Sequence, residues 1–209
     1  MIYPLTNVLS LCRVRDSSFW PMHRQELSRT AGGRTQAKDL GSPLWRASFT
    51  TAPARHAKSA SVEAALLSLN GSTGSFLAHD MRRPYPVAHR DGNFADTAVI
   101  DALTAFDAFY MRLGGLAPGM ILSPGDYLGF AYGPTPSRAL HVVTSGGTVT
   151  AGGKVELQIY PPLRAGAALN APVSLKRAPC EMILEPAQEA PRLVQRVASQ
   201  VSFSAIQIL

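Results

Sequence analysis

Turn-forming residues interrupt this chain so often that most of the segments between them are too short for a helix. The 17 glycines and 16 prolines are spread along all 209 residues and form no continuous tract. Scattered Gly and Pro punctuate short elements, whereas a pooled tract would indicate a flexible linker. The sequence therefore predicts a mainly β fold with many short strands, in a chain long enough to bury its own core.

Several segments between the turns have the pattern of strands. In residues 44–50, Trp45 begins an alternation of apolar and polar side chains, which predicts a strand with one buried face. The segments 22–29 and 34–40 flank a pair of glycines and predict a hairpin. Further strands are predicted over residues 7–14, 74–79, 125–130, 139–144, 154–160, 173–176, 180–184 and 200–208.

A helical period appears in residues 59–69. Apolar side chains recur from Val62 to Leu69 on one stripe, and Ser59 or Ser61 precedes them as a candidate N-cap. This segment predicts an α-helix that ends before Gly71.

Residues 96–113 fit two interpretations. Short alternating strands suit the segment, but the local pattern favours a helix. The helical stripe consists of Val99, Leu103, Phe106, Tyr110 and Leu113.

The charge balance indicates interfaces with other molecules. Charged residues make up 16% of the chain, below the usual value of about 25%. Low charge is expected of a chain whose surface is largely covered by neighbours. The net charge is +6, and 16 of the 20 basic residues are Arg, the cation favoured at protein interfaces. Contact with nucleic acid or with another acidic surface is a second interpretation of this excess.

The residues that could carry chemistry are dispersed. Cys12 and Cys180 lie far apart and have no His at ligand spacing, so they are predicted to be buried structural thiols. No metal, cofactor or catalytic residue is predicted, and the chain is expected not to be an enzyme. A cell-wall hydrolase with a Cys nucleophile remains an alternative. The histidines occupy five separate segments, at His23, His56, His79, His89 and His141.

Two charged or aromatic segments have alternative interpretations. His79 and Asp80, followed by Arg82 and Arg83, could form an acid/base or phosphate-handling cluster. The favoured prediction is that Asp80 lies where a strand runs into a solvated loop, because adjacent side chains of an extended chain point to opposite sides. The segment from Tyr127 to Arg138 interleaves aromatic and basic residues in a possible β-barrel, and single-strand nucleic-acid binders stack bases on such rings. A barrel core requires aromatic residues too, so a nucleic-acid-binding barrel is the less favoured alternative.

No segment approaches the roughly 18 to 20 apolar residues of a membrane helix, so the chain is expected to be soluble, made in the cytoplasm and not inserted in a membrane. Residues 1–12 lack the basic start of a lipoprotein signal.

A set of aromatic, glycine, proline and charged residues follows a fixed order from the strand at 44–50 to the C-terminal strands. Its members are Trp45, Gly71, Gly74, Phe76, Asp80, Pro86, Gly125, Asp126, Tyr127, Pro161 and Arg164. With the segment 180–184, their order and spacing resemble the distal tail proteins of long-tailed, siphovirus-like bacteriophages. The resemblance spans about residues 45–209. Two segments depart from the family pattern: the charged loop before Pro86, and residues 96–113.

The resemblance implies a tail-tube-like β-sandwich with one flanking α-helix, formed by residues 1–95 together with 170–209. An inserted β lobe, a small barrel or meander, would comprise residues 96–169. It also implies a structural virion protein that forms a ring, expected to be a hexamer, between the tail tube and the hub or baseplate. Its partners would be other copies of itself, the tail tube protein and the hub proteins, with DNA passing through the lumen.

Overall fold

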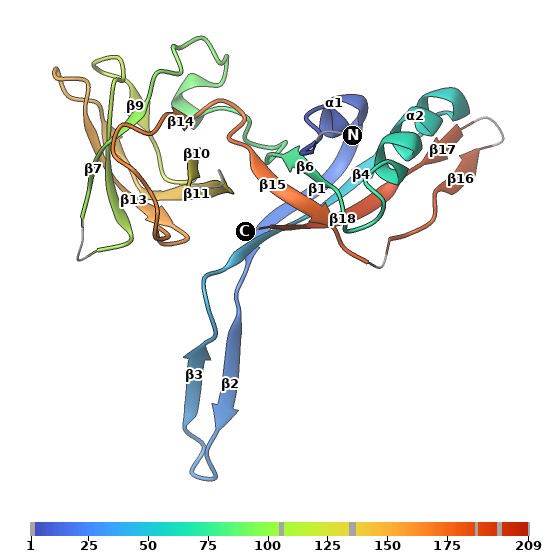
Figure 1. Cartoon of the computed structure of the whole chain (residues 1–209), viewed down its shortest axis with the longest axis horizontal. Coiled ribbons are helices and arrows are strands. Elements are labelled where there is room, and N and C mark those ends of the chain that lie inside the picture. Colours follow the sequence, from blue (N-terminus) through green and yellow to red (C-terminus); the bar gives the residue numbers. More distant parts are fainter. Residues whose placement is uncertain (1–2, 105–106, 134–136, 187, 196–197, 209) are drawn as a thin grey trace.

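The computed structural model describes residues 3–104, 107–133, 137–186, 188–195 and 198–208. Over these residues the fold is mainly β, with two α-helices. Two lobes lie side by side, and a long hairpin projects between them, so that the outline is that of a T (Figure 1). Both ends of the chain contribute to the first lobe, and the middle of the chain forms the second.

The first lobe contains a five-stranded antiparallel sheet in the order β1-β4-β18-β15-β6. The predicted strand at 44–50 is confirmed, because Trp45, Ala47 and Phe49 are buried and alternate with more exposed neighbours. The C-terminal strand is confirmed in the same way by buried Phe203 and Ala205. The strands of this sheet are β1 (Val14–Met22), β4 (Leu44–Thr51), β6 (Ser75–Ala78), β15 (Cys180–Leu184) and β18 (Ser202–Gln207).

Two helices and a small sheet complete the first lobe. Helix α1 (Val8–Leu11) and helix α2 (His56–Leu67) contribute apolar side chains to the core beneath the five-stranded sheet. The small sheet consists of β16 (Arg192–Gln195), β17 (Ala198–Gln200) and β5 (Ala54–Arg55).

Helix α2 confirms the predicted helix but begins earlier, at His56, and the predicted serine cap is wrong. The N-cap residue is Arg55, whose side chain makes no capping bond. Ser59 instead lies inside the helix, where its hydroxyl donates to the backbone oxygen of Ser199 at 3.2 Å. Strand β5 runs directly into α2, so pairing with β17 rather than a side-chain cap determines where the helix starts.

The strand predicted over residues 7–14 is also wrong, because this segment forms α1 before β1 begins at Val14. Val8 and Leu9 are buried against the first core. Adjacent side chains can enter one core from a helical turn, whereas a strand would direct them to opposite faces.

The second lobe is built on a six-stranded sheet in the order β14-β10-β11-β13-β8-β7, with a separate pair, β9 and β12. A 3₁₀ helix, η1 (Val87–His89), lies in the segment that enters this lobe. A second hydrophobic core lies against the sheet. The strands are β7 (Val99–Leu103), β8 (Tyr110–Gly114), β9 (Ile121–Leu122), β10 (Tyr127–Tyr132), β11 (Ser137–Ser145), β12 (Gly147–Thr148), β13 (Val155–Tyr160) and β14 (Val173–Ser174).

The helical interpretation of residues 96–113 is wrong for the part that the structure describes; Phe106, from the predicted stripe, lies outside it. Strands β7 and β8 pair with each other, and β8 also pairs with β13. Just before β8, the Asp107 carboxylate accepts the backbone N–H of Phe109 at 2.8 Å. Pairing with the distant strand β13 outweighs the local helical pattern.

The predicted hairpin is confirmed as β2 (Gln25–Arg29) paired with β3 (Thr35–Asp39). We call residues 23–43 the arm. It extends from the ends of β1 and β4 away from both lobes (Figure 1), and every residue of its two strands is exposed.

The second core predicts a clear difference between two leucines of one lobe. Leu157 is 1% exposed and Leu169 is 57% exposed. We expect Leu157→Ala to lower the free energy of unfolding by about 2–5 kcal/mol, because it leaves a cavity. Leu169→Ala should change this free energy by less than about 0.5 kcal/mol. Urea denaturation followed by circular dichroism measures both, and equal effects would contradict this description of the core.

Candidate functional site at the joint between the lobes

Three aromatic rings from different strands meet where the two lobes join. The ring centroids of Phe19 and Trp45, from the first lobe, are 5.4 Å apart. Tyr127, from β10 of the second lobe, packs edge-on against both, at 6.2 Å from Phe19 and 5.6 Å from Trp45. Edge-on pairs at these separations are favourable beyond the area that they bury. We call this region the joint.

Hydrogen bonds from β4 and β18 also cross the joint. The indole N–H of Trp45 donates to the backbone oxygen of Leu140 at 2.7 Å. The buried Gln207 side chain accepts the backbone N–H of Trp45 at 3.2 Å and donates to the backbone oxygen of Arg138 at 3.3 Å. Leu140 and Tyr127 pack in the first core although their strands belong to the second lobe. The two lobes therefore share packed side chains as well as polar contacts.

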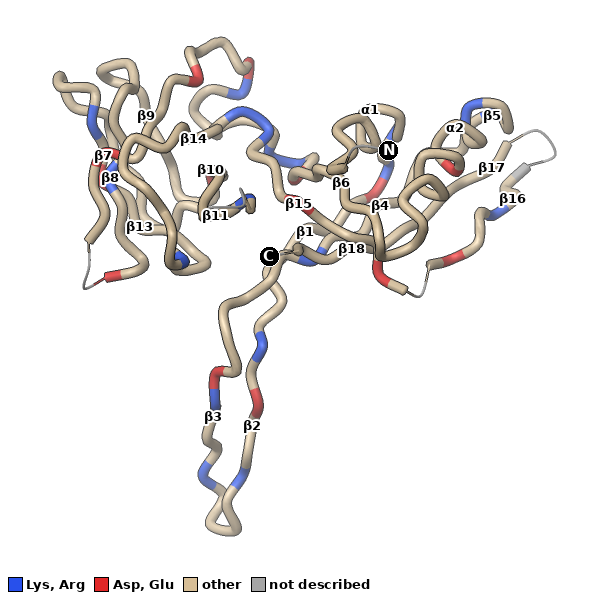
Figure 2. The backbone as a smooth tube through the Cα atoms, in the orientation of Figure 1, with Lys and Arg blue, Asp and Glu red and all other residues tan. Residues whose placement is uncertain are grey.

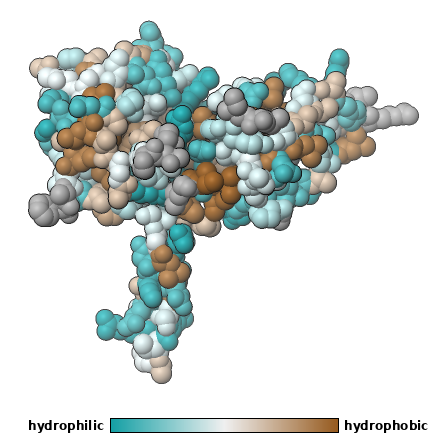
Figure 3. All heavy atoms as spheres, viewed as in Figure 1, coloured by the Kyte–Doolittle hydropathy of each residue, from teal (hydrophilic) through white to brown (hydrophobic). Residues whose placement is uncertain are grey.

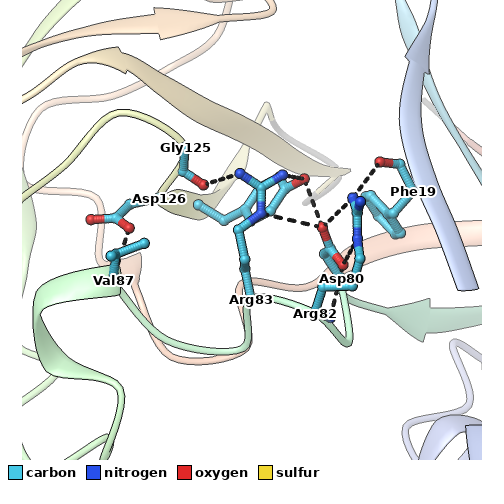
Figure 4. A network of polar contacts seen from close by, with 8 residues as sticks. Phe19, Asp80, Arg82, Arg83, Val87, Gly125 and Asp126 are labelled. Atoms are coloured by element: carbon cyan, nitrogen blue, oxygen red, sulfur yellow. Dashed lines mark hydrogen bonds and ion pairs between the residues drawn. The ribbon is translucent and has the colours of Figure 1, made fainter.

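A buried carboxylate, Asp80, lies beside the three rings and is 3% exposed. It accepts bonds from Arg82: the backbone N–H at 2.9 Å, Nε at 3.1 Å and Nη2 at 2.9 Å (Figure 4). The hydroxyl of Tyr127 donates to the same carboxylate at 3.1 Å. Arg82 also donates to the backbone oxygen of Phe19 at 3.3 Å, which ties this cluster to β1.

Arg83 extends the cluster into the second lobe. Its guanidinium donates to the backbone oxygen of Gly125 at 2.8 Å and to the Tyr127 hydroxyl at 3.1 Å (Figure 4). It also lies 4.9 Å from the centre of the Tyr127 ring, and its Nε is 3.6 Å from Asp80. One side chain thus contacts the loop before β10, the ring of Tyr127 and the buried carboxylate.

The ionisation of the joint is set by these contacts. Burial acts to raise the pKa of Asp80, but the hydrogen bonds and charge of Arg82 and the bond from Tyr127 outweigh it, so the pKa lies below its ordinary value. Burial raises the pKa of Tyr127 to about 12, with a further contribution from the charge of Asp80. At neutral pH Asp80 is an anion that accepts and Tyr127 is a phenol that donates. A carboxylate with its donors already in place is poorly suited to act as a base.

A second buried carboxylate, Asp126, fixes the segment that leads from the first lobe into the second. It accepts the backbone N–H of Val87 at 2.8 Å and that of Ser123 at 2.7 Å. Burial raises its pKa, opposed by these two bonds. Pro86 immediately precedes Val87 and has no N–H of its own to donate. Gly125 has φ +94°, a backbone conformation that favours glycine, and a Cβ there would lie 2.7 Å from the Arg83 guanidinium, which would have to shift.

Arg164 and Pro161 lie on a second side of the joint. Arg164 donates to the backbone oxygen of Pro43 at 3.1 Å, which links the second lobe to the base of the arm. The backbone oxygen of Pro161 is 2.7 Å from Nδ1 of buried His141. Because a carbonyl oxygen only accepts, Nδ1 carries the proton and Nε2 is left as a buried acceptor. Burial is the main cause that lowers the pKa of His141 to about 4, so the ring is neutral at pH 7.

Most of the residues that carry the family resemblance meet at or beside the joint. These are Trp45, Asp80, Pro86, Gly125, Asp126, Tyr127, Pro161 and Arg164. The others lie in the first lobe. Phe76 is a core residue, Gly71 has φ +66° after α2, and Gly74 lies where a Cβ would be 2.5 Å from the Tyr3 ring.

Sequence reasoning missed three members of the joint: Phe19, Arg82 and Arg83. The expectation of a solvated loop is wrong for Asp80, which is buried and ion-paired. The pair of arginines two and three residues after Asp80 was a usable signal, because a carboxylate with two nearby cations can be buried at lower cost. Phe19 carried no signal beyond an aromatic residue in a strand.

The geometry gives little support to the two alternative functions, a cell-wall hydrolase and a nucleic-acid-binding barrel. Cys12 is 6% exposed and Cys180 is 0% exposed, which is unsuited to a nucleophile. Burial raises the pKa of Cys12 to about 11 and also raises the pKa of Cys180. The rings of Tyr127 and Phe130 are 6% and 5% exposed and therefore present little surface for stacking bases.

Two further findings concern the described residues alone. No three His, Cys, Asp or Glu side chains gather there as a metal site would require. Neither helix has the length and apolarity needed to cross a bilayer.

In comparisons with known proteins, no protein-family model matches the chain and no curated protein matches it.

Removing the charge of Asp80 should weaken the joint. We expect Asp80→Asn to lower the free energy of unfolding by roughly 1–3 kcal/mol at pH 7, because two arginines lose their ionic partner. Asp16→Asn, at an exposed site on β1, is the matched control and should have almost no effect. Urea denaturation of the three proteins measures the difference.

The stability difference between wild type and Asp80→Asn should depend on pH. The pKa of Asp80 is lowered in the folded state, so its contribution is fully present above the ordinary value of 3.8 and is lost as pH falls through the folded value. The difference in unfolding free energy between wild type and Asp80→Asn should therefore shrink as the pH falls below about 4. A difference that stays constant from pH 7 to pH 2.5 would show that the charge of Asp80 does not stabilise the joint.

Burial also predicts unreactive thiols. At pH 8 the native protein should react with Ellman's reagent at least about 100-fold more slowly than the unfolded chain, because both thiols are protonated and covered. Ser10→Cys, at an exposed position of α1, should supply one fast-reacting thiol under the same conditions. Rapid reaction of a native thiol would instead favour the hydrolase alternative.

Proposed function

We propose that this chain is a structural protein of a phage tail, whose copies form a ring at the distal end of the tail. In this role it joins the tail tube to the hub or baseplate and lines the channel through which DNA leaves. The first lobe corresponds to a tail-tube-like β-sandwich with a flanking helix, and the second to an inserted β lobe. The protein is not an enzyme, and its location is the virion.

The observation that carries the proposal is the arm. A two-stranded hairpin without further packing is marginally stable in water, yet all ten strand residues of this hairpin are exposed. Its outer strand edges also present unpaired N–H and C=O groups, which natural proteins usually cover or pair. An arm of this kind is expected where a neighbouring molecule supplies the missing contacts.

The exposed face of the five-stranded sheet is the face that we propose lines the channel, and its side chains support this. Hydroxyl groups on this face form hydrogen bonds with one another. The Ser18 and Ser48 hydroxyl oxygens are 2.7 Å apart, and those of Thr50 and Ser202 are 3.2 Å apart. The tube through β4, β18 and β15 is largely free of charged residues (Figure 2). Arg46 on this face is paired with Glu185 at 2.8 Å. Trp20 of β1 is a large exposed side chain on this face, at 68%. The small, weakly charged groups of the other strands suit a surface along which DNA passes without binding tightly.

Self-association tests the proposal. Light scattering over a concentration series should detect a discrete species near six times the 22.3 kDa of one chain, and negative-stain images should show a ring with a central hole. A protein that remains monomeric at high concentration and is indifferent to tail tube protein would count heavily against the ring.

An arm deletion provides the control. Replacing residues 24–41 by Asn-Gly should leave the free energy of unfolding unchanged within about 0.5 kcal/mol, because the removed side chains are exposed. The same variant should lose the ring species. A ring that forms equally well without the arm would remove the main support for the proposal.

A further inference from the structure

An apolar groove lies at the end of the first lobe, beside α2. It encloses about 430 Å³, and its walls come from α2, the ends of β15 and β18, and the segment before β16. Leu67 on its rim is 78% exposed. Hydrophobic side chains also gather on the surface over the neighbouring β16 (Figure 3), where Leu193 is 70% exposed. The apolar lining residues are Leu66, Leu67, Leu184, Pro191, Val201 and Phe203.

The charged residues that line this groove are acidic. Glu63 and Glu189 contribute carboxylates, and no Lys or Arg lines the groove among the residues that the structure describes. Glu189 is paired with Arg192 at 3.2 Å, but both side chains are more than half exposed, so this ion pair is screened by water. The groove is therefore an apolar surface with an acidic rim, which suits an apolar side chain flanked by cations.

The arm has the complementary composition. Leu27 is 70% exposed and lies opposite Ala37 in the register of β2 and β3, so the two form an apolar spot partway along the hairpin. The arm carries four basic residues against two acidic ones, Glu26 and Asp39. The basic residues are Arg24, Arg29, Arg34 and Lys38.

The groove cannot receive the arm of its own chain. The arm extends downward from between the lobes, whereas α2 and β16 lie at the far end of the first lobe (Figure 1). About ten residues on each side of the hairpin give it a reach of roughly 33 Å, which is enough to reach a neighbouring molecule. An arm that fills the groove would therefore belong to a second copy of the chain.

We propose that the arm of one copy docks in the α2 groove of the next copy, with the Leu27 side facing Leu67 and basic residues facing Glu63. The two surfaces differ, so this contact is heterologous, and repetition closes into a ring when the rotation permits. The inference rests on the proposed self-assembly and names the surfaces that bring it about.

Disulfide trapping tests the docking. Leu27→Cys and Leu67→Cys are placed in separate chains, mixed and oxidised, and the native Cys12 and Cys180 do not interfere because both are buried. A disulfide forms only where the two Cα atoms approach within about 7 Å. We expect the covalent 27–67 pair to form at least about tenfold faster than the pair between Leu27→Cys and Ile121→Cys, a control at an exposed site of the second lobe. Peptide mapping identifies each pair.

A charge reversal gives a second readout. Glu63→Lys should weaken self-association about tenfold or more, because it places a cation opposite the basic arm. Glu156→Lys, at an exposed glutamate of β13, should leave self-association unchanged. Circular dichroism confirms that both variants are folded.

The outcomes separate the two proposals. A ring species without preferential 27–67 trapping overturns the docking and leaves the ring proposal standing. A monomer at all concentrations, with neither ring nor trapping, overturns the docking and also counts against the ring. The partner of the groove would then be a different protein. Preferential trapping, together with loss of association in Glu63→Lys, supports the docking.

Discussion

The placement of Tyr127 between the two lobes is the constraint on which the remaining geometry depends. Its ring packs against Phe19 and Trp45, and its hydroxyl donates to Asp80. The hydroxyl adds a donor from the second lobe to the carboxylate that Arg82 already satisfies from the first, and the ring adds apolar contact. Together with Arg83 they fix the second lobe relative to the first.

A fixed joint matters because the base of the arm is attached to it. Strands β1 and β4 supply Phe19 and Trp45 to the joint and continue directly into the arm, and Arg164 of the second lobe holds Pro43 at the arm's base. The orientation of the arm is thereby tied to both lobes. In the proposed ring, this would let every copy present its arm to the next copy in the same direction, as closed symmetry requires.

The sequence patterns succeeded where burial of one face decided the structure. The alternation around Trp45 and Phe203 identified two central strands, and the glycine pair at Gly32 identified the arm. They failed where distant pairing decided it. Residues 96–113 became strands because β13 lies beside them, and Val8 entered a helical turn because a core was there to receive it.

The sequence by itself determined the fold class and the hairpin that forms the arm, because turn residues and side-chain periodicity act locally. The spacing of the two cysteines, with no His nearby, also predicted two separate buried thiols. The family resemblance selected residues from Trp45 to Arg164 without showing that most of them meet. Only the tertiary structure brought Asp80, Arg83 and Tyr127 together and left the arm and the α2 groove uncovered. These features depend on contacts between residues far apart in the chain, and local periodicity contains no information about such contacts.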